Sequence, residues 1–213
     1  MLGLLVLVLA VLLAFIEFGA IEYAYARLGI SHRAITLLLL LTVLGSLINL
    51  PIASVSTQHM VAAKTIYVFG VPYVSPPAIQ VGRTVIAINV GGALIPTIFS
   101  FYLLWRLGGW LRAAIAIALV ALIVHRVARI VPGVGIAVPT LLPGIVAALA
   151  AWLVDRSRRA SIAYVAGTMG CLLGADLSNL ASVAQMRAPM VSIGGAGTFD
   201  GVFVAGIVAV LLA

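Results

Sequence analysis

Long apolar stretches fill most of this chain and constrain its fold more than any other feature. Seven of them are interpreted as membrane-spanning helices: 2–27, Ile35–Ile52, Val85–Leu107, Trp110–Val131, Gly133–Val154, Ser161–Val183 and Val191–Ala213. Only 8% of the residues are charged and 64% are hydrophobic, whereas about a quarter of a soluble domain is charged. The sequence therefore predicts an all-α polytopic membrane protein of the cell membrane.

The formal net charge of +7 comes from arginines near the ends of these stretches. Counting loops on alternate sides gives two sets: Arg27, Arg33, Arg106, Arg112, Arg156, Arg158 and Arg159 on one side, and Lys64, Arg83, Arg126, Arg129 and Arg187 on the other. The larger set is expected in the cytoplasm, which puts the N-terminus outside and the C-terminus inside. The expected partner of this charge is the lipid bilayer and not nucleic acid.

A segment between the second and third stretches differs from the rest. Residues Ser56–Thr84 are rich in β-branched and aromatic residues and are interrupted by Pro76-Pro77. This pattern predicts a small β-hairpin outside the bilayer at 64–84. We expect it on the same face as the 184–190 loop, because an even number of spans separates the two.

Two sequence blocks occur twice, which favours an internal repeat. Leu44–Leu50 resembles Leu173–Leu180, and Asn89–Ala93 resembles Ser192–Ala196. The repeats are predicted at 1–107 and 133–213, joined by a connecting helix at 110–131. This 3+1+3 arrangement would relate spans two and three to spans six and seven by rotation about the membrane normal. Chance recurrence of Gly-Gly and Leu-Gly in apolar sequence is the alternative.

Two aspartates, Asp176 and Asp200, lie within or beside the last two stretches. A charged group in the bilayer costs roughly 2.5–3.5 kcal/mol on insertion scales, so such residues are candidates for function. If the chain turns near 187–189, each aspartate is about twelve residues from the turn, and antiparallel helices bring both to one depth. They are the candidate catalytic residues.

Glycine, proline and asparagine residues in the two repeats are candidates for binding a substrate: Gly194, Gly195, Gly197, Gly91, Gly92, Pro96, Asn89, Asn49 and Asn179. They can open the backbone of a membrane helix to a ligand. The alternative is structural, because glycine permits close helix packing and asparagine bonds between helices. Three scattered histidines give no metal-ligand spacing, and no cofactor fingerprint is present.

Four blocks of this sequence resemble a prokaryotic membrane family known as a domain of unknown function, DUF1614: Leu44–Pro51, Gly82–Pro96, Gly174–Leu177 and Ser192–Phe203. This resemblance covers nearly the whole chain and implies no assigned activity. More loosely, the chain is similar to presenilin-like, GxGD-type intramembrane aspartyl proteases. That resemblance implies that Asp176 and Asp200 activate a water for peptide hydrolysis, although Gly197 stands one position too far from Asp200 for the motif.

Three functions remain open from the sequence. The first is an intramembrane aspartyl protease whose Asp176/Asp200 dyad acts on a transmembrane peptide. The second is a small, proton-coupled carrier for a solute, which the parallel repeat favours. The third is a non-catalytic membrane scaffold. Only the second repeat carries the aspartates, and this asymmetry favours the protease. The sequence does not determine the oligomeric state.

Overall fold

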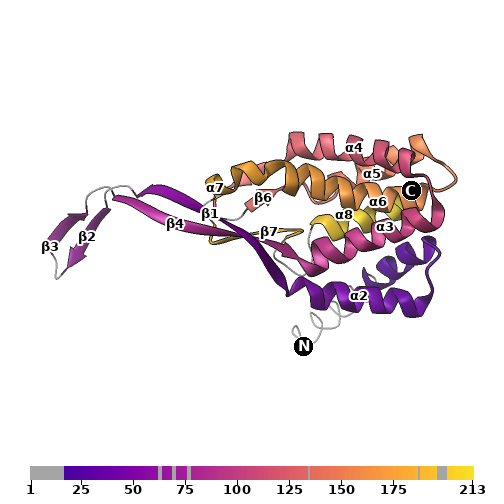
Figure 1. Cartoon of the computed structure of the whole chain (residues 1–213), viewed down its shortest axis with the longest axis horizontal. Helices are drawn as coiled ribbons and strands as arrows, with labels where there is room; N and C mark the ends of the chain where they lie inside the picture. Colours follow the sequence, from indigo (N-terminus) through magenta and orange to yellow (C-terminus); the bar gives the residue numbers. More distant parts are fainter. Residues whose placement is uncertain are drawn as a thin grey trace, which may run out of the picture.

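The computed structural model describes residues 17–61, 64–68, 71–75, 78–133, 135–186, 188–195 and 201–213. These residues form a helical bundle, and a long β-ribbon projects from one end of it (Figure 1). The connections between the helices alternate between the ribbon end and the opposite end. The arginines around residues 27, 106 and 156–159 lie together at that opposite end.

The bundle is built from helices of unequal length. Residues 17–27 are helical, and the other helices in chain order are α2 (His32–Ser46), η1 (Val90–Leu94), α3 (Ile95–Leu107), α4 (Trp110–Val127), α5 (Leu142–Val154), α6 (Arg159–Cys171), η2 (Leu172–Asp176), η3 (Leu177–Ser182), α7 (Val183–Met186) and α8 (Gly201–Leu212). Within the described residues, three helical segments are long and apolar enough to cross a membrane: Val90–Leu107, Trp110–Val127 and Arg159–Ser182. Three shorter apolar helices accompany them, namely α2, α5 and α8.

The ribbon consists of paired antiparallel strands. β1 (Asn49–Val61) pairs with β4 (Ala78–Asn89), and further out β2 (Lys64–Val68) pairs with β3 (Val71–Ser75). At its base, β7 (Met190–Ile193) pairs with β4 in parallel, which gives the strand order β1-β4-β7. A separate small hairpin joins β5 (Arg129–Val131) to β6 (Gly135–Ala137).

Several predicted span boundaries are wrong, because strands occupy the ends of apolar stretches. Val85–Asn89 belongs to β4 and not to the third span, and the hairpin placed at 64–84 begins at Asn49. The connecting helix predicted at 110–131 ends at Val127, and the helix within the predicted fifth span starts at Leu142 and not at Gly133. Apolar, β-branched sequence suits a buried strand as well as a membrane helix, so periodicity alone does not separate them.

Helix α6 is the centre of the bundle, packing against α3, α4, α5 and α8. Glycines allow this close packing. A Cβ atom at Gly167 would lie 2.8 Å from the carbonyl oxygen of Ala205 on α8, and one at Gly174 of η2, which continues α6, would lie 2.4 Å from that of Ala121 on α4. Backbones that approach so closely leave no room for a side chain, which is how small residues assemble membrane helices.

The outer faces of the helices expose an extensive apolar surface. Large hydrophobic side chains of α2, α3, α4 and α5 are exposed, among them Leu37, Leu40, Leu44, Ile98, Phe101, Leu111, Leu122, Leu149 and Leu153. Contiguous apolar surface on this scale marks contact with a membrane or another protein. All three tryptophans, Trp105, Trp110 and Trp152, are exposed near the ends of α3, α4 and α5 that lie away from the ribbon (Figure 1).

Candidate functional site

Asp176 lies where the long sixth helix loses its regular α-helical form. The α-helix ends at Cys171, a π-helical turn runs to Asp176, and a 3₁₀ segment follows. Its Oδ2 atom accepts a 2.7 Å hydrogen bond from the backbone nitrogen of Gly194, which directly follows β7. The carboxyl group is therefore fixed between the helix break and the end of the strand.

Asp176 also lines a cavity of about 130 Å³ at the base of the ribbon. The whole of β7 forms one side of it, together with Gly195, and the other lining residues are Gly135, Ile136, Leu180 and Met186. Because β7 is an outer strand of its sheet, the cavity runs along a sheet edge. A space of this size beside polar groups has room for water molecules.

A hydrogen-bonded network joins the two halves of the chain beside this cavity. Asn89 and Asn49 face each other in the β1–β4 register, and Asn89 Nδ2 donates to Asn49 Oδ1 at 3.1 Å. Ser192 Oγ of β7 donates to the same Asn49 oxygen at 2.5 Å. Asn89 Nδ2 also donates to the Ser46 carbonyl, and Asn89 Oδ1 accepts from the Gly92 nitrogen. Two of the predicted binding residues, Asn49 and Asn89, thus connect β7, which lines the cavity, to elements of the first half of the chain.

The two Gly-Gly pairs of the proposed repeats lie against each other. Gly194 and Gly195 have φ values of 82° and 78°, and a Cβ atom at Gly194 would lie 2.6 Å from Gly92 C and Ala93 N. β4 and β7 run in parallel, each is followed by such a pair, and each pair precedes a helix of the bundle, α3 or α8.

Other predicted site residues have structural contacts of their own. Asn179 Nδ2 donates to the Ala175 carbonyl at 2.7 Å and so caps its own disrupted helix. Gly91 packs on α2, because a Cβ atom there would lie 2.1 Å from the Thr42 carbonyl oxygen. Pro96 is buried in the first turn of α3. The predicted residues Gly197 and Asp200 lie outside the described part of the chain.

Sequence reasoning missed a histidine–serine contact near the same helix break. His125 Nδ1, at the end of α4, lies 2.9 Å from Ser178 Oγ. The serine hydroxyl donates to the Gly174 carbonyl at 2.6 Å, so its proton already has a backbone acceptor. Both residues are exposed, and their contact links the end of α4 to η3. Among the residues described here, no group of three or more His, Cys, Asp or Glu could hold a metal ion.

Comparison with protein families gives one match. The model of a family described as a protein of unknown function, DUF1614, matches residues 43–212. The chain belongs to the DUF1614 family. The matched range holds the ribbon, both Gly-Gly pairs and the two candidate catalytic aspartates. Neither the curated proteins nor the solved structures that were searched gave a match, so the resemblance to presenilin-like proteases finds no support among them.

Proposed function

We propose that this DUF1614 protein is an intramembrane aspartyl protease that uses Asp176 and Asp200 as its catalytic pair. The observation that carries the proposal is the position of Asp176 on the wall of a cavity of about 130 Å³ that runs along the outer strand β7. Substrate helices hide their peptide bonds, so a protease must hold the substrate chain in extended form. Strand addition to a sheet edge does this through main-chain hydrogen bonds.

The proposed reaction needs two carboxyl groups that share one proton. The ionised carboxylate takes a proton from a water, whose oxygen attacks the carbonyl carbon of the peptide. The protonated carboxyl donates its proton to the carbonyl oxygen, which gives a neutral gem-diol. As the C–N bond breaks, the carboxyl that took the water proton gives it to the leaving nitrogen, and the other carboxylate takes a proton from a gem-diol hydroxyl, so both groups return to their starting states. Asp176 supplies one carboxyl from the helix break, and Asp200, directly before α8, is the proposed second.

The proposed architecture is a seven-span membrane protein with parallel 3+1+3 repeats. The parallel pairing of β4 with β7, each followed by Gly-Gly and a helix, supports the repeat. The clustering of arginines at the end away from the ribbon supports a cytoplasmic position for that end. The N-terminus and the ribbon then lie outside, and the C-terminus lies in the cytoplasm of a cell-membrane protein.

Peptide cleavage in proteoliposomes tests the proposal. The wild-type protein should cut a transmembrane reporter peptide, and Asp176→Asn and Asp200→Asn should each reduce the rate by at least about a hundredfold. Asparagine has the shape of aspartate, and in Asp176→Asn the side-chain amide oxygen could still accept from Gly194, so unfolding temperatures should change little. Glu17→Gln is the matched control, because Glu17 is an exposed acid of the first helical segment. If no peptide of a broad panel is cut, the protease proposal fails.

A second candidate, a small proton-coupled carrier, rests on a different observation. The two halves meet at a polar junction, where Ser192 of the second half bonds to Asn49 of the first. Parallel-repeat carriers bind their substrates at such an interface. In this case a pH gradient drives solute uptake, the aspartate variants lose that uptake, and no peptide is cut. Absence of both activities favours the non-catalytic scaffold.

A further inference from the structure

A second cavity, of about 650 Å³, lies at the end of the bundle away from the ribbon. It is formed where the first helical segment, α3 and the α5–α6 connection meet. Five arginines line it: Arg27, Arg106, Arg156, Arg158 and Arg159. They come from three separate parts of the sequence, so only the fold brings all five charges to one place.

Backbone and ring contacts hold several of these guanidinium groups in position. Arg27 Nη1 donates to the Val210 carbonyl at 2.7 Å, and Arg106 Nη1 donates to the Gly29 carbonyl at 2.9 Å. The guanidinium of Arg156 stacks on Trp152, 4.3 Å from the ring centroid. Contacts to neutral partners fix these cations without reducing their charge, so the cavity is already arranged for an anion.

Glycine turns make space for two of the arginines. Gly29 and Gly109 both have positive φ values, 72° and 85°. A Cβ atom at Gly109 would lie 3.3 Å from Nη1 of Arg158, and one at Gly29 would lie 3.7 Å from Nη2 of Arg106. The guanidinium groups therefore rest on backbone turns that carry no side chains.

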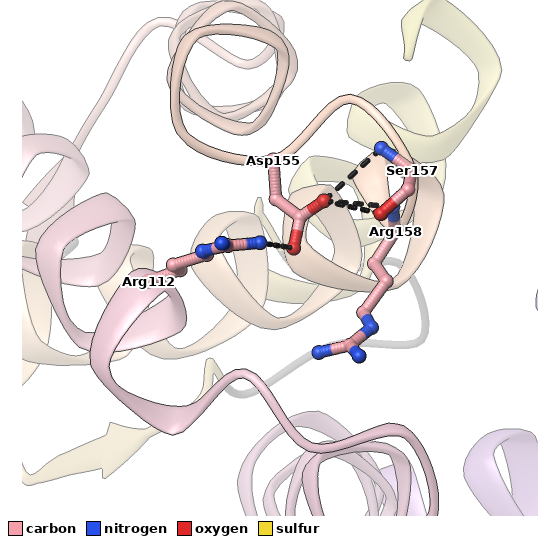
Figure 2. Close-up of polar contacts among 4 residues, drawn as sticks. All are labelled: Arg112, Asp155, Ser157 and Arg158. Carbon is pink, nitrogen blue, oxygen red and sulfur yellow. Dashed lines mark hydrogen bonds and ion pairs between the residues drawn. The ribbon is translucent and has the colours of Figure 1, made fainter.

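Among the described residues that line this cavity, none carries a carboxylate. Asp155, next to Arg156 in the sequence, is committed to other donors (Figure 2). Its Oδ2 atom accepts from Arg112 at 2.6 Å, and its Oδ1 atom accepts from Ser157 and from the backbone of Arg158. It therefore organises the loop that carries three of the arginines without neutralising their side chains within the cavity.

The cavity also lies at the level expected for lipid headgroups. The chain's three tryptophans, all exposed, occur near this end of the bundle, and tryptophans concentrate at the interface between membrane and water. Basic pockets between membrane helices at the cytoplasmic surface bind phosphorylated headgroups. A volume of about 650 Å³ exceeds what one phosphate fills and suits a headgroup with more than one.

We propose that this arginine-lined cavity binds the phosphates of a multiply charged anionic lipid headgroup. Guanidinium groups suit this ligand because each can donate two parallel hydrogen bonds to phosphate oxygens. The site is separate from Asp176 and requires no catalytic activity. Free pyrophosphate offers the same chemistry without acyl chains, so the test must distinguish the two sources.

The test measures lipid retention by native mass spectrometry of the purified full-length protein. Wild-type protein is titrated in detergent with tetraoleoyl cardiolipin, with dioleoyl phosphatidylcholine or with sodium pyrophosphate. We expect cardiolipin to bind at least about tenfold more tightly than phosphatidylcholine, since each basic residue near an anionic surface contributes roughly fivefold. The Arg156→Gln/Arg159→Gln variant should lose this preference and still fold, because both side chains lie at the surface of the loop and helix start that carry them.

The matched control is Arg83→Gln/Arg126→Gln, which removes two exposed arginines at the ribbon end. It should keep the cardiolipin preference of the wild type. If both double variants lost the cardiolipin preference equally, the overall positive charge of the protein and not this cavity would attract the lipid. This result would overturn the proposal. Binding of pyrophosphate without cardiolipin enrichment would overturn the lipid assignment. No preference for any of the anions would overturn the site itself.

Discussion

The backbone nitrogen of Gly194 donates a 2.7 Å hydrogen bond to Oδ2 of Asp176. This contact ties the residue after strand β7 to a carboxylate at the break in the central helix. It holds the carboxylate beside the edge strand, where the proposed extended substrate would add to the sheet.

Gly194→Ala should destabilise the protein. Its φ of 82° costs a residue with a Cβ atom roughly 1–2 kcal/mol, and the new atom would lie 2.6 Å from Ala93 N. Gly19→Ala is the control, because Gly19 is helical and a Cβ atom there meets nothing within 4 Å. Thermal unfolding in detergent should show a lower midpoint for Gly194→Ala only. Equal midpoints would mean that the turn tolerates a side chain.

Asn89→Ala should also destabilise the protein, by about 2–4 kcal/mol, because it leaves several buried polar groups without their partner. Asn89 bonds to Ser46, Asn49 and Gly92, which belong to different elements of the first half. Asn179→Ala removes contacts within one helix alone and should cost about 1 kcal/mol or less. Chemical denaturation of both variants measures the difference. A larger effect at Asn179 would contradict the assigned role of the network.

The parts of the fold that follow from composition could be predicted from the sequence. The parts where the same residues suit either a helix or a strand could not. The scarcity of charge identified a chain rich in apolar helices, and in the part of the chain that the structure describes three helices have the length to cross a membrane. The sequence Val85–Asn89 is as apolar as a helix start, yet it forms a strand because β1 and β7 pair with it on either side. Such pairing partners are distant in sequence, so local pattern cannot identify them.

The candidate site was predictable in part. An aspartate in an apolar stretch directs attention to Asp176 without any structure. Its partner Gly194 and the cavity along β7 depend on a contact between segments that only the fold brings together. The arginines were counted from the sequence as an orientation signal. They converge on one cavity because three helix connections meet there. In the sequence, only the cluster Arg156–Arg159 indicated a basic site at one of these connections.

Stability should depend on pH through Asp155. Hydrogen bonds from Ser157 and then from Arg112 hold the pKa of the buried Asp155 carboxyl well below its usual range. Because the pKa is lower in the folded state, the ionised carboxyl stabilises the fold at pH values above the unfolded-state pKa of about 3.9. This stabilisation is lost as the pH falls towards the folded-state pKa. Asp155→Asn should therefore unfold more easily than wild type at pH 7, and the gap should narrow below about pH 4. A gap that is constant down to pH 3 would contradict this.

Membrane orientation can be tested with single cysteines in a Cys171→Ser background. Thr65→Cys lies in β2 of the ribbon, and Arg33→Cys lies at the exposed start of α2, near the arginine cavity. A membrane-impermeant maleimide should label position 65 in intact cells and position 33 only after permeabilisation, because the side richer in arginine stays in the cytoplasm. The reverse pattern would reject the proposed orientation.

The separation of the Asp176 and Asp200 carboxyl groups tests the central claim most directly. It can be measured by electron cryomicroscopy of the full chain in lipid nanodiscs, with an extended peptide-like inhibitor bound. The protease account predicts carboxyl oxygens within about 7 Å of each other, with one water or inhibitor hydroxyl in hydrogen-bond reach of both. A separation well beyond ~10 Å in that state would contradict a shared acid–base pair.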